Sequence, residues 1–244
     1  MDAQILHVDA HVVVVLKPSG LSTVPFDDRD VDTLDARVRS WLERRKLVRP
    51  SSRPNLGVVH RLDKETSGVV VFTRTWLAKQ SLAGQFRRHA VLRRYVAIAH
   101  GEVRERTHRS WLVEDRGDGL RGSVRGTPGS NAREAITHVE PVERLPGATF
   151  VSCRLETGRT HQIRIHLSES GHPIVGERVY VRGYAAARIE APRLMLHAIE
   201  LGFLHPVTEQ TMQWEVPMPE DMAKVIIRLK RGAGRARGDD GEAG

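Results

Sequence analysis

The segment 60–68 (His-Arg-Leu-Asp-Lys-Glu-Thr-Ser-Gly) constrains this chain most strongly, because it places a carboxylate in a polar turn between two apolar runs. The run before it is 56–59 (Leu-Gly-Val-Val), and the run after it is 69–72 (Val-Val-Val-Phe). β-Branched residues fill both runs, which predicts two short buried strands. Asp63 therefore stands at the end of buried strands, two residues after Arg61. This placement favours a nucleophile, although an Asp that only caps the turn backbone would have the same spacing.

Hydrophobic periodicity elsewhere predicts more strands than helices. Thr33 is expected to cap the helix 34–45, and Thr160 to cap a helix that ends at Gly171. Segment 101–134 is interpreted as two weak strands in a long loop. The other expected strands are 5–8, 12–16, 93–99, 135–142, 149–155, 196–204 and 212–216, and the other helices are 76–89 and 219–229. Short polar turns join many of these elements, which favours an α+β fold with a mixed, largely antiparallel sheet and flanking helices.

The length of 244 residues fits one large domain or two small ones and can bury a substantial core. We expect a single folded domain over 1–230 and a disordered tail over 231–244, which is rich in Gly and charge. No apolar run approaches the roughly 18 residues of a membrane helix, and the N-terminus lacks the pattern of a secretory signal. The single Cys153 cannot form an internal disulfide, which suits a reducing cytoplasm, and its apolar neighbours favour a packing role.

The formal net charge of +8 suggests a polyanionic partner. Most of the 38 basic residues are Arg, whose planar donor fork suits phosphate and stacks on nucleobases. An Arg-rich genome would give the same composition, so the charge alone does not identify the partner.

Five segments, in this order along the chain, resemble the RluA family of RNA pseudouridine synthases. They are 16–21 (Leu-Lys-Pro-Ser-Gly-Leu), 60–68, 94–101 (Arg-Tyr-Val-Ala-Ile-Ala-His-Gly), 157–166 (Thr-Gly-Arg-Thr-His-Gln-Ile-Arg-Ile-His) and 194–198 (Leu-Met-Leu-His-Ala). The resemblance implies the pseudouridine synthase fold, with the active site in a central cleft across the sheet. It implies a catalytic domain over 1–230, acting on ribosomal or transfer RNA in the cytoplasm as a monomer. The S4 domain that many members carry is expected to be absent, because the first strand begins near residue 5.

The resemblance also implies the catalytic residues. Asp63 matches the catalytic carboxylate, Arg164 the arginine that pairs with it, and Tyr95 the ring that stacks on the target base. On its own, Tyr95 would read as a core residue and Arg164 as a surface helix residue. The helical spacing places Arg164 on one face with His161 and Ser168.

The RNA-contacting residues expected from the same pattern form a second group. Arg61 resembles the arginine that fills the gap left by a flipped base, although a phosphate contact or a solvent-facing turn residue would also fit. The full set of expected RNA contacts is Lys17, His60, Arg61, Arg94, Arg159 and His161.

The implied reaction breaks an N-glycosidic bond, turns the uracil and rejoins it through carbon, so no cofactor is expected. A carboxylate suits this step because it can trap the electron-poor sugar carbon. No metal site is expected either: His161 and His166 are five residues apart, which is not the spacing of a helical zinc site. Segment 158–160 at a helix start could bind an anion through backbone N–H groups.

Two features leave alternatives open. An Asp is usual in the family where Glu177 stands, and a Gly where Val181 stands, which puts the shape of that loop in doubt. A hydrolase of the N-glycosidic bond would share the carboxylate logic and need a second carboxylate, for which Glu65 and Glu156 are candidates. A basic RNA-binding module without catalysis is the other rival. Mass-neutral conversion of uridine would distinguish the synthase from both rivals, because the hydrolase releases uracil and the binding module leaves uridine unchanged.

Overall fold

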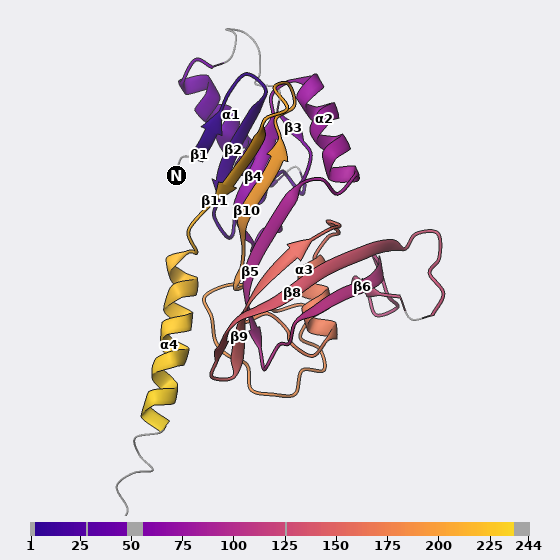
Figure 1. Ribbon diagram of the computed structural model, residues 1–244, viewed down its shortest axis with the longest axis vertical. Helices are drawn as coiled ribbons and strands as arrows, with labels where there is room; N and C mark the ends of the chain where they lie inside the picture. Colours follow the sequence, from indigo (N-terminus) through magenta and orange to yellow (C-terminus); the bar gives the residue numbers. More distant parts are fainter. Residues whose placement is uncertain (1–2, 28, 48–55, 125, 237–244) are drawn as a thin grey trace, which may run out of the picture. The chain divides into compact units, whose positions relative to one another are not determined.

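The computed structural model describes residues 3–27, 29–47, 56–124 and 126–236. The chain divides into two compact units, the first made of 1–93 and 198–216 and the second of 94–197 and 217–244. The boundaries between the units fall inside β5 (Leu92–His100) and β10 (Leu196–Leu204), so both strands contribute residues to both units. Figure 1 follows the chain through all elements by colour.

The first unit is built on the strand order β1-β2-β4-β10 (Figure 1). Its strands are β1 (Gln4–Val8), β2 (Val12–Lys17), β3 (Gly57–Val58), β4 (Ser67–Thr73), the end of β10, and β11 (Thr211–Glu215). β1 pairs antiparallel with β2, β2 and β3 with β4, and β10 with β11. β4 confirms the buried strand expected after Asp63, whereas the run before it forms only the two-residue β3, in which Val58 is exposed.

Two helices, α1 (Leu34–Arg44) and α2 (Trp76–Arg87), complete the first unit. α2 begins at Thr75, whose side chain accepts a hydrogen bond from the backbone N–H of Ala78. Thr33 is the N-cap of α1 as expected, but its hydroxyl donates to the Asp35 carboxylate and caps no backbone group. The apolar core of the unit contains Val12, Val14, Val69, Val71, Ala78, Leu82, Val91, Leu201, Phe203 and Val216.

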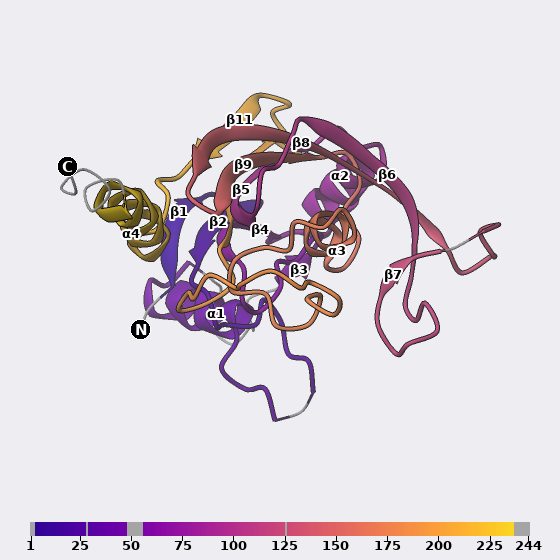
Figure 2. The ribbon, with the colours of Figure 1, turned by 90° about the horizontal axis from the view of Figure 1, so that it is seen from below.

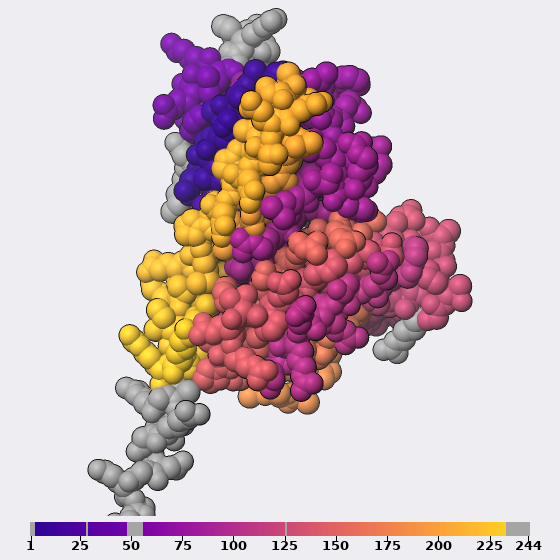
Figure 3. Space-filling model, viewed as in Figure 1, coloured from indigo at the N-terminus to yellow at the C-terminus, as the bar shows by residue number. Residues whose placement is uncertain are grey.

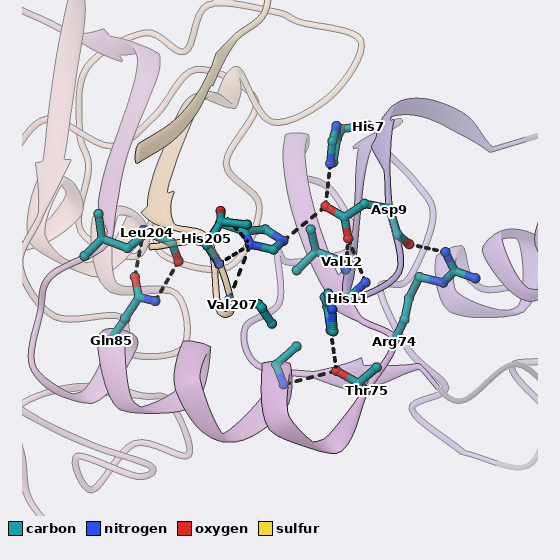
Figure 4. Close-up of polar contacts among 12 residues, drawn as sticks. His7, Asp9, His11, Val12, Arg74, Thr75, Gln85, Leu204, His205 and Val207 are labelled. Atoms are coloured by element: carbon teal, nitrogen blue, oxygen red, sulfur yellow. Dashed lines mark hydrogen bonds and ion pairs between the residues drawn. The ribbon is translucent and has the colours of Figure 1, made fainter. Parts of the chain in front are cut away.

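The Asp9 carboxylate joins the β1–β2 turn to the β10–β11 loop of the first unit (Figure 4). One oxygen accepts backbone N–H groups from the β1–β2 turn, including that of His11 at 2.7 Å. The other lies 2.8 Å from His7 Nε2 and 3.2 Å from His205 Nε2, which comes from the β10–β11 loop. His11 Nδ1 lies 3.2 Å from the hydroxyl of Thr75 at the start of α2. The contact with the start of α2 is thus made by His11, whose N–H the carboxylate holds.

The second unit has the strand order β5-β9-β8-β6-β7, with antiparallel pairing of β5 with β9, β9 with β8, β8 with β6 and β6 with β7. The strands are β6 (Arg106–Val113), β7 (Gly122–Ser123), β8 (Arg133–Leu145) and β9 (Ala148–Leu155), beside β5. α3 (Gln162–Glu169) lies on the concave side of this curved sheet (Figure 2). α4 (Glu220–Ala236) packs beside β8 (Figure 3), where Lys230 forms an ion pair with Glu143 at 2.6 Å.

Three local expectations are corrected. β6 is a regular strand of eight residues, not a weak one, because β8 pairs along it. The N-cap of α3 is His161 instead of Thr160, and no side chain caps the helix there. α4 continues past Leu229 to Ala236, so the helix includes the first residues of the predicted disordered tail. Residues 237–244 of that tail lie outside the described residues, and the single domain over 1–230 stays a prediction.

Two further observations bear on the sequence reading. Within the described ranges, no helix is long and apolar enough to cross a membrane. Cys153 is fully buried in β9, and burial raises the pKa of its thiol to about 12, which fits the packing role expected for it.

Candidate active site

Asp63 lies in the short turn between β3 and β4 and is half-buried. The Thr66 backbone N–H donates to the Asp63 carbonyl at 3.0 Å and closes the turn. This bond uses the Asp63 backbone carbonyl, whereas the alternative considered from the sequence was a turn capped by the Asp63 side chain.

The first motif segment, 16–21, lies directly beside this turn. The Gly20 N–H donates to the Lys64 carbonyl at 2.8 Å, and the Ser19 hydroxyl donates to the Glu65 carbonyl at 2.7 Å. Gly20 has a φ of +81°, a left-handed conformation that costs glycine little. Two segments more than forty residues apart in the chain are thus joined by hydrogen bonds next to Asp63.

Lys17 holds these two segments from the inside. Its side chain is fully buried, and Nζ donates to the carbonyls of Pro18 at 3.0 Å, Leu21 at 2.6 Å and Lys64 at 3.0 Å. A buried ammonium is tolerated only when hydrogen bonds replace its lost water. A contact of Lys17 with RNA stays a prediction, and it would require the ammonium to leave these carbonyls.

Thr23 fixes the residue next to Asp63, a role that the sequence reading did not anticipate. Its hydroxyl donates to the Leu62 carbonyl at 2.8 Å and accepts from the Leu62 N–H at 3.2 Å. The Leu62 side chain is buried as well. Asp63 is therefore flanked by backbone that is fastened on both sides.

His60 and Arg61, both expected to contact RNA, have different surroundings. The His60 ring stacks on Phe86, with centroids 4.8 Å apart, and Nε2 accepts the Val71 N–H at 3.1 Å. Burial, with a smaller effect of the Arg93 charge, lowers the pKa of His60 to about 3. His60 is thus a neutral packing group at pH 7, and an RNA contact by it stays a prediction. Arg61 is exposed to solvent, as an RNA-contacting residue must be.

The close approach of β4 and β10 explains two small residues in the motif segments. Gly68 has a φ of +133°, and a Cβ there would lie 2.3 Å from the Ala198 carbonyl oxygen and 2.5 Å from the Ala198 Cβ. Any side chain at residue 68 would collide with backbone. Gly68 and Ala198 therefore let the strand that follows Asp63 lie against its neighbour.

In the second unit, α3 carries Arg164, whose guanidinium is almost fully buried. Arg164 Nε and Nη2 donate to the two carboxylate oxygens of Glu177, at 2.7 Å and 2.8 Å. Such two-point pairing fixes the plane of the guanidinium. The sequence reading missed this partner, because Glu177 was noted only as a departure from the family pattern. The ion pair expected between Arg164 and Asp63 stays a prediction.

Tyr180 confirms that His161, Arg164 and Ser168 share one face of α3. Tyr180 OH lies 2.7 Å from His161 Nδ1, the Arg164 guanidinium carbon lies 5.2 Å from the Tyr180 ring centroid, and the Ser168 hydroxyl donates to the Tyr180 carbonyl. This face is covered by protein, so Arg164 is not a surface helix residue. His161 has a φ of +58°, which is uncommon for a residue with a side chain.

Gln162 holds the start of α3. Its amide oxygen accepts from the Thr157 hydroxyl at 2.7 Å and the Arg159 N–H at 3.0 Å, while its amide nitrogen donates to Thr137 and to the Ile136 carbonyl at 2.9 Å each. None of these bonds caps a backbone N–H of α3; they fasten its first residue to the preceding turn and to β8. They also explain why the 157–166 segment has a fixed shape beside β8.

The other expected site residues also belong to the second unit. Tyr95 lies on β5, opposite Cys153 of β9, and is 9% exposed. Arg94 is half-buried on the same strand. Arg159 is exposed and donates through Nε to the Glu134 carbonyl at 2.9 Å. Asp63 belongs to the first unit, so its proximity to Tyr95 and Arg164 stays a prediction.

A cavity of about 550 Å³ lies beside Arg159 in the second unit. It is lined by Leu112, Val113, Glu114, Asp115, Arg121, Asn131, Arg133, Gly158, Arg159 and Thr160. Most of these residues come from segment 101–134, which the sequence left without a role. Charged and amide groups dominate the lining, so the cavity suits a polar ligand.

No metal site is evident within the part of the chain that the structure describes, where no three His, Cys, Asp or Glu side chains are grouped to hold an ion. Of the two carboxylates considered for a hydrolase, Glu65 is exposed. Glu156 lies 2.7 Å from His138 Nε2, and that hydrogen bond holds the pKa of Glu156 below its usual value despite some desolvation.

Comparison with known proteins places this chain in a family. Residues 11–169 match the family model described as RNA pseudouridylate synthase. The chain is 36% identical over 234 residues to the ribosomal large subunit pseudouridine synthase D of Nitrosomonas europaea, covering 93% of this chain and 65% of that protein. It is 35% identical over 233 residues to the uncharacterized RNA pseudouridine synthase YlyB of Bacillus subtilis, covering 95% and 74%. The chain thus spans slightly less than two thirds of the Nitrosomonas relative.

Solved structures agree with the fold. Human RNA pseudouridylate synthase domain containing 4 superposes with a TM-score of 0.73 at 25% identity, covering 93% of this chain and 92% of that one. The related human domain containing 1 has a TM-score of 0.67 at 21% identity, covering 93% and 94%. The pseudouridine synthase fold, with its mostly antiparallel sheet, is confirmed.

The chain therefore belongs to the RNA pseudouridylate synthase family, within the RluA type that its motifs resemble, and is an RNA pseudouridine synthase, an isomerase. This confirms the resemblance read from the sequence and sets aside the hydrolase. The family implies an RNA substrate.

Proposed function

We propose that this enzyme isomerises specific uridines of ribosomal RNA to pseudouridine, with Asp63 as nucleophile. The observation that carries the proposal is the bracing of the Asp63 turn by Lys17, Ser19 and Gly20, three residues of a separate motif segment. A nucleophile must be held in one geometry to react efficiently. The name of the Nitrosomonas relative favours the large ribosomal subunit over transfer RNA as the source of substrate.

In the proposed reaction the Asp63 carboxylate attacks or stabilises the sugar C1′ while the bond from C1′ to N1 of uracil breaks. The detached uracil turns and its C5 bonds to C1′; where Asp63 has formed an ester with C1′, that bond breaks in the same step and the carboxylate is released. The C5 proton is lost and N1 gains a proton. Atoms and electrons balance, so no cofactor is needed. Arg164 pairs with Asp63 to keep it ionised, and Tyr95 stacks on the base while it is detached.

We assign the RNA contacts to the following basic side chains. Arg61 and Arg159 are exposed, Arg94 is half-buried, and Arg159 lines the cavity beside segment 101–134. His161, held by Tyr180, belongs to the same set through its position at the start of α3. We further propose that the enzyme acts in the cytoplasm as a monomer. The matched Nitrosomonas relative is bacterial, and the single Cys153 is buried, which suits a reducing compartment.

The test is pseudouridine formation on defined RNAs. The purified enzyme is incubated with transcribed large-subunit ribosomal RNA or with transfer RNA, and mass-neutral conversion of uridine is mapped by base-specific chemistry. Wild-type enzyme should modify the ribosomal RNA, and Asp63→Asn should abolish conversion while RNA binding persists. Glu65→Gln, a change to the neighbouring exposed carboxylate, is the matched control and should remain active.

Two results would overturn the proposal. Conversion by Asp63→Asn at a rate near wild type would remove Asp63 from the chemistry. Modification of transfer RNA alone would leave the chemistry intact but replace the substrate.

A further inference from the structure

The Glu177 carboxylate is buried and forms an ion pair with Arg164. Its side chain is fully buried, and the Arg164 side chain is 9% exposed. Oε2 accepts from Arg164 Nε at 2.7 Å, and Oε1 accepts from Nη2 at 2.8 Å. One edge of the guanidinium therefore pairs with one carboxylate. This pairing fixes the position and the plane of the Arg164 guanidinium.

Glu177 is itself fastened by backbone groups. Oε1 also accepts the N–H groups of Arg178 at 3.0 Å, Val179 at 2.8 Å and Tyr180 at 3.3 Å. The carboxylate therefore caps the turn that follows it while it holds Arg164. A shift of this turn would move the guanidinium with it.

The residue before Glu177 admits no side chain. Gly176 has a φ of +84°, and a Cβ there would lie 1.9 Å from the Arg193 carbonyl oxygen. On the same stretch, the Val175 N–H donates to the Ile98 carbonyl of β5 at 2.8 Å. The backbone that carries Glu177 is thus anchored to the sheet of the second unit, so the carboxylate is a rigid support.

Tyr180 supports the guanidinium from its face. The Arg164 guanidinium carbon lies 5.2 Å from the Tyr180 ring centroid, within the range of a cation–π contact. Glu177 and Tyr180 belong to the same turn, so one short segment fixes both an edge and a face of Arg164.

The charge of Glu177 persists at neutral pH. Burial alone would raise the pKa of this carboxyl group, but the hydrogen bonds and charge of Arg164, with the N–H groups of Val179 and Tyr180, hold the pKa below its usual value. Arg164 thus faces a permanent anion inside the protein, regardless of the state of the substrate.

We propose that Glu177 is a positioning residue that holds the guanidinium of Arg164 in the orientation in which it pairs with Asp63. This inference rests on the proposed function. A guanidinium has five N–H donors, and Glu177 holds the Nε–Nη2 edge, so the direction of the Nη1 donors is fixed as well. A stabilising role alone is a weaker explanation, because desolvation largely offsets the energy of a buried ion pair.

The experiment measures single-turnover rate at saturating ribosomal RNA, RNA dissociation constant and melting temperature for Glu177→Gln. Gln keeps the size of the side chain but cannot form the charged fork. We expect the rate to fall about 100-fold, as for a catalytic group that is misplaced by about 1 Å, with the dissociation constant little changed. Glu177→Asp, which restores the charge on a shorter side chain, should lose about tenfold.

A double-mutant cycle separates positioning from general stabilisation. If Glu177 acts through Arg164, adding Glu177→Gln to Arg164→Ala should slow the residual rate no further. Full additivity of the two losses, or a wild-type rate for Glu177→Gln, would overturn the proposal. If Glu177→Gln does not fold, Glu177→Asp takes its place in the same cycle, and a wild-type rate for that variant would overturn the proposal.

The matched control is the Arg193–Asp221 pair of the same unit. Arg193 Nε and Nη2 donate to the Asp221 carboxylate at 2.5 Å and 2.8 Å, the same fork geometry on a different guanidinium. Asp221→Asn should therefore lower the melting temperature without slowing the rate per folded molecule, and an equal slowing would count against a specific role for Glu177. If Asp63→Asn and Arg164→Ala both keep full activity, the proposed function fails. If both are inactive while Glu177→Gln is unaffected, only the positioning role fails.

Discussion

Lys17 and Lys64 are joined by a hydrogen bond in which the buried ammonium of Lys17 donates to the Lys64 backbone carbonyl at 3.0 Å. The bond links the motif segments 16–21 and 60–68. The sequence showed their order along the chain but did not predict that they are in contact. The bond makes Lys17 an internal support of the Asp63 turn, and the first prediction follows from that role.

Lys17→Met should both destabilise the enzyme and slow it. Met keeps the length and apolar stem of the side chain but leaves three carbonyl acceptors without their donor. Each buried unsatisfied group costs about 1–3 kcal/mol, so the free energy of unfolding should fall by several kcal/mol at most. Denaturant unfolding and single-turnover rate are the measurements. Lys79→Met, at an exposed position of α2, should change neither.

Gly68→Ala should destabilise the first unit more than Gly20→Ala does. Both positions have positive φ, but a Cβ at Gly20 meets nothing within 4 Å, whereas one at Gly68 meets the Ala198 backbone at 2.3 Å. Backbone strain alone costs about 1–2 kcal/mol, and the collision adds about 1–3 kcal/mol. Thermal unfolding of the two variants decides the matter. Equal losses would show that β4 and β10 can move apart without cost.

His60 should make the enzyme sensitive to acid. Its pKa is lowered to about 3 in the folded state by burial and, less, by Arg93, whereas an unfolded histidine titrates near pH 6.5. Between these values the unfolded state binds the extra proton, so the stability is complete above pH 6.5 and is lost as the pH falls toward 3. One such group contributes a slope of up to about 1.4 kcal/mol per pH unit.

The measurement for this prediction is the free energy of unfolding from pH 7 to pH 4. His60→Gln keeps an acceptor for the Val71 N–H but does not titrate, so its profile should be flatter than that of wild type. His166 and His197, whose pKa values burial lowers to about 4, should produce the slope that remains. Parallel profiles for His60→Gln and wild type would contradict the prediction.

The sequence predicted local features of the site better than contacts between distant segments. The apolar runs around Asp63 follow from consecutive β-branched residues, and the shared helical face of His161, Arg164 and Ser168 follows from a period of 3.6; both signals act over a few residues. The pairing of Arg164 with Glu177 crosses a loop, and no periodicity selects the partner there. The extension of α4 through Gly232 was missed because glycine lowers helix propensity by about 1 kcal/mol.

The last prediction concerns the salt dependence of RNA binding. Each cation that neutralises a phosphate releases counterions, so the logarithm of the binding constant falls linearly with the logarithm of salt concentration. Arg61 is exposed in the turn that carries Asp63, and Arg61→Ala should reduce that slope by about one. Arg37→Ala provides the control, because Arg37 donates to Asp32 through both Nε and Nη2 at 2.6 Å and its charge is already matched. Binding constants from about 50 to 200 mM salt supply the slopes. An unchanged slope for Arg61→Ala would show that Arg61 contacts no phosphate, and an equal reduction for Arg37→Ala would show that the effect reports net charge alone.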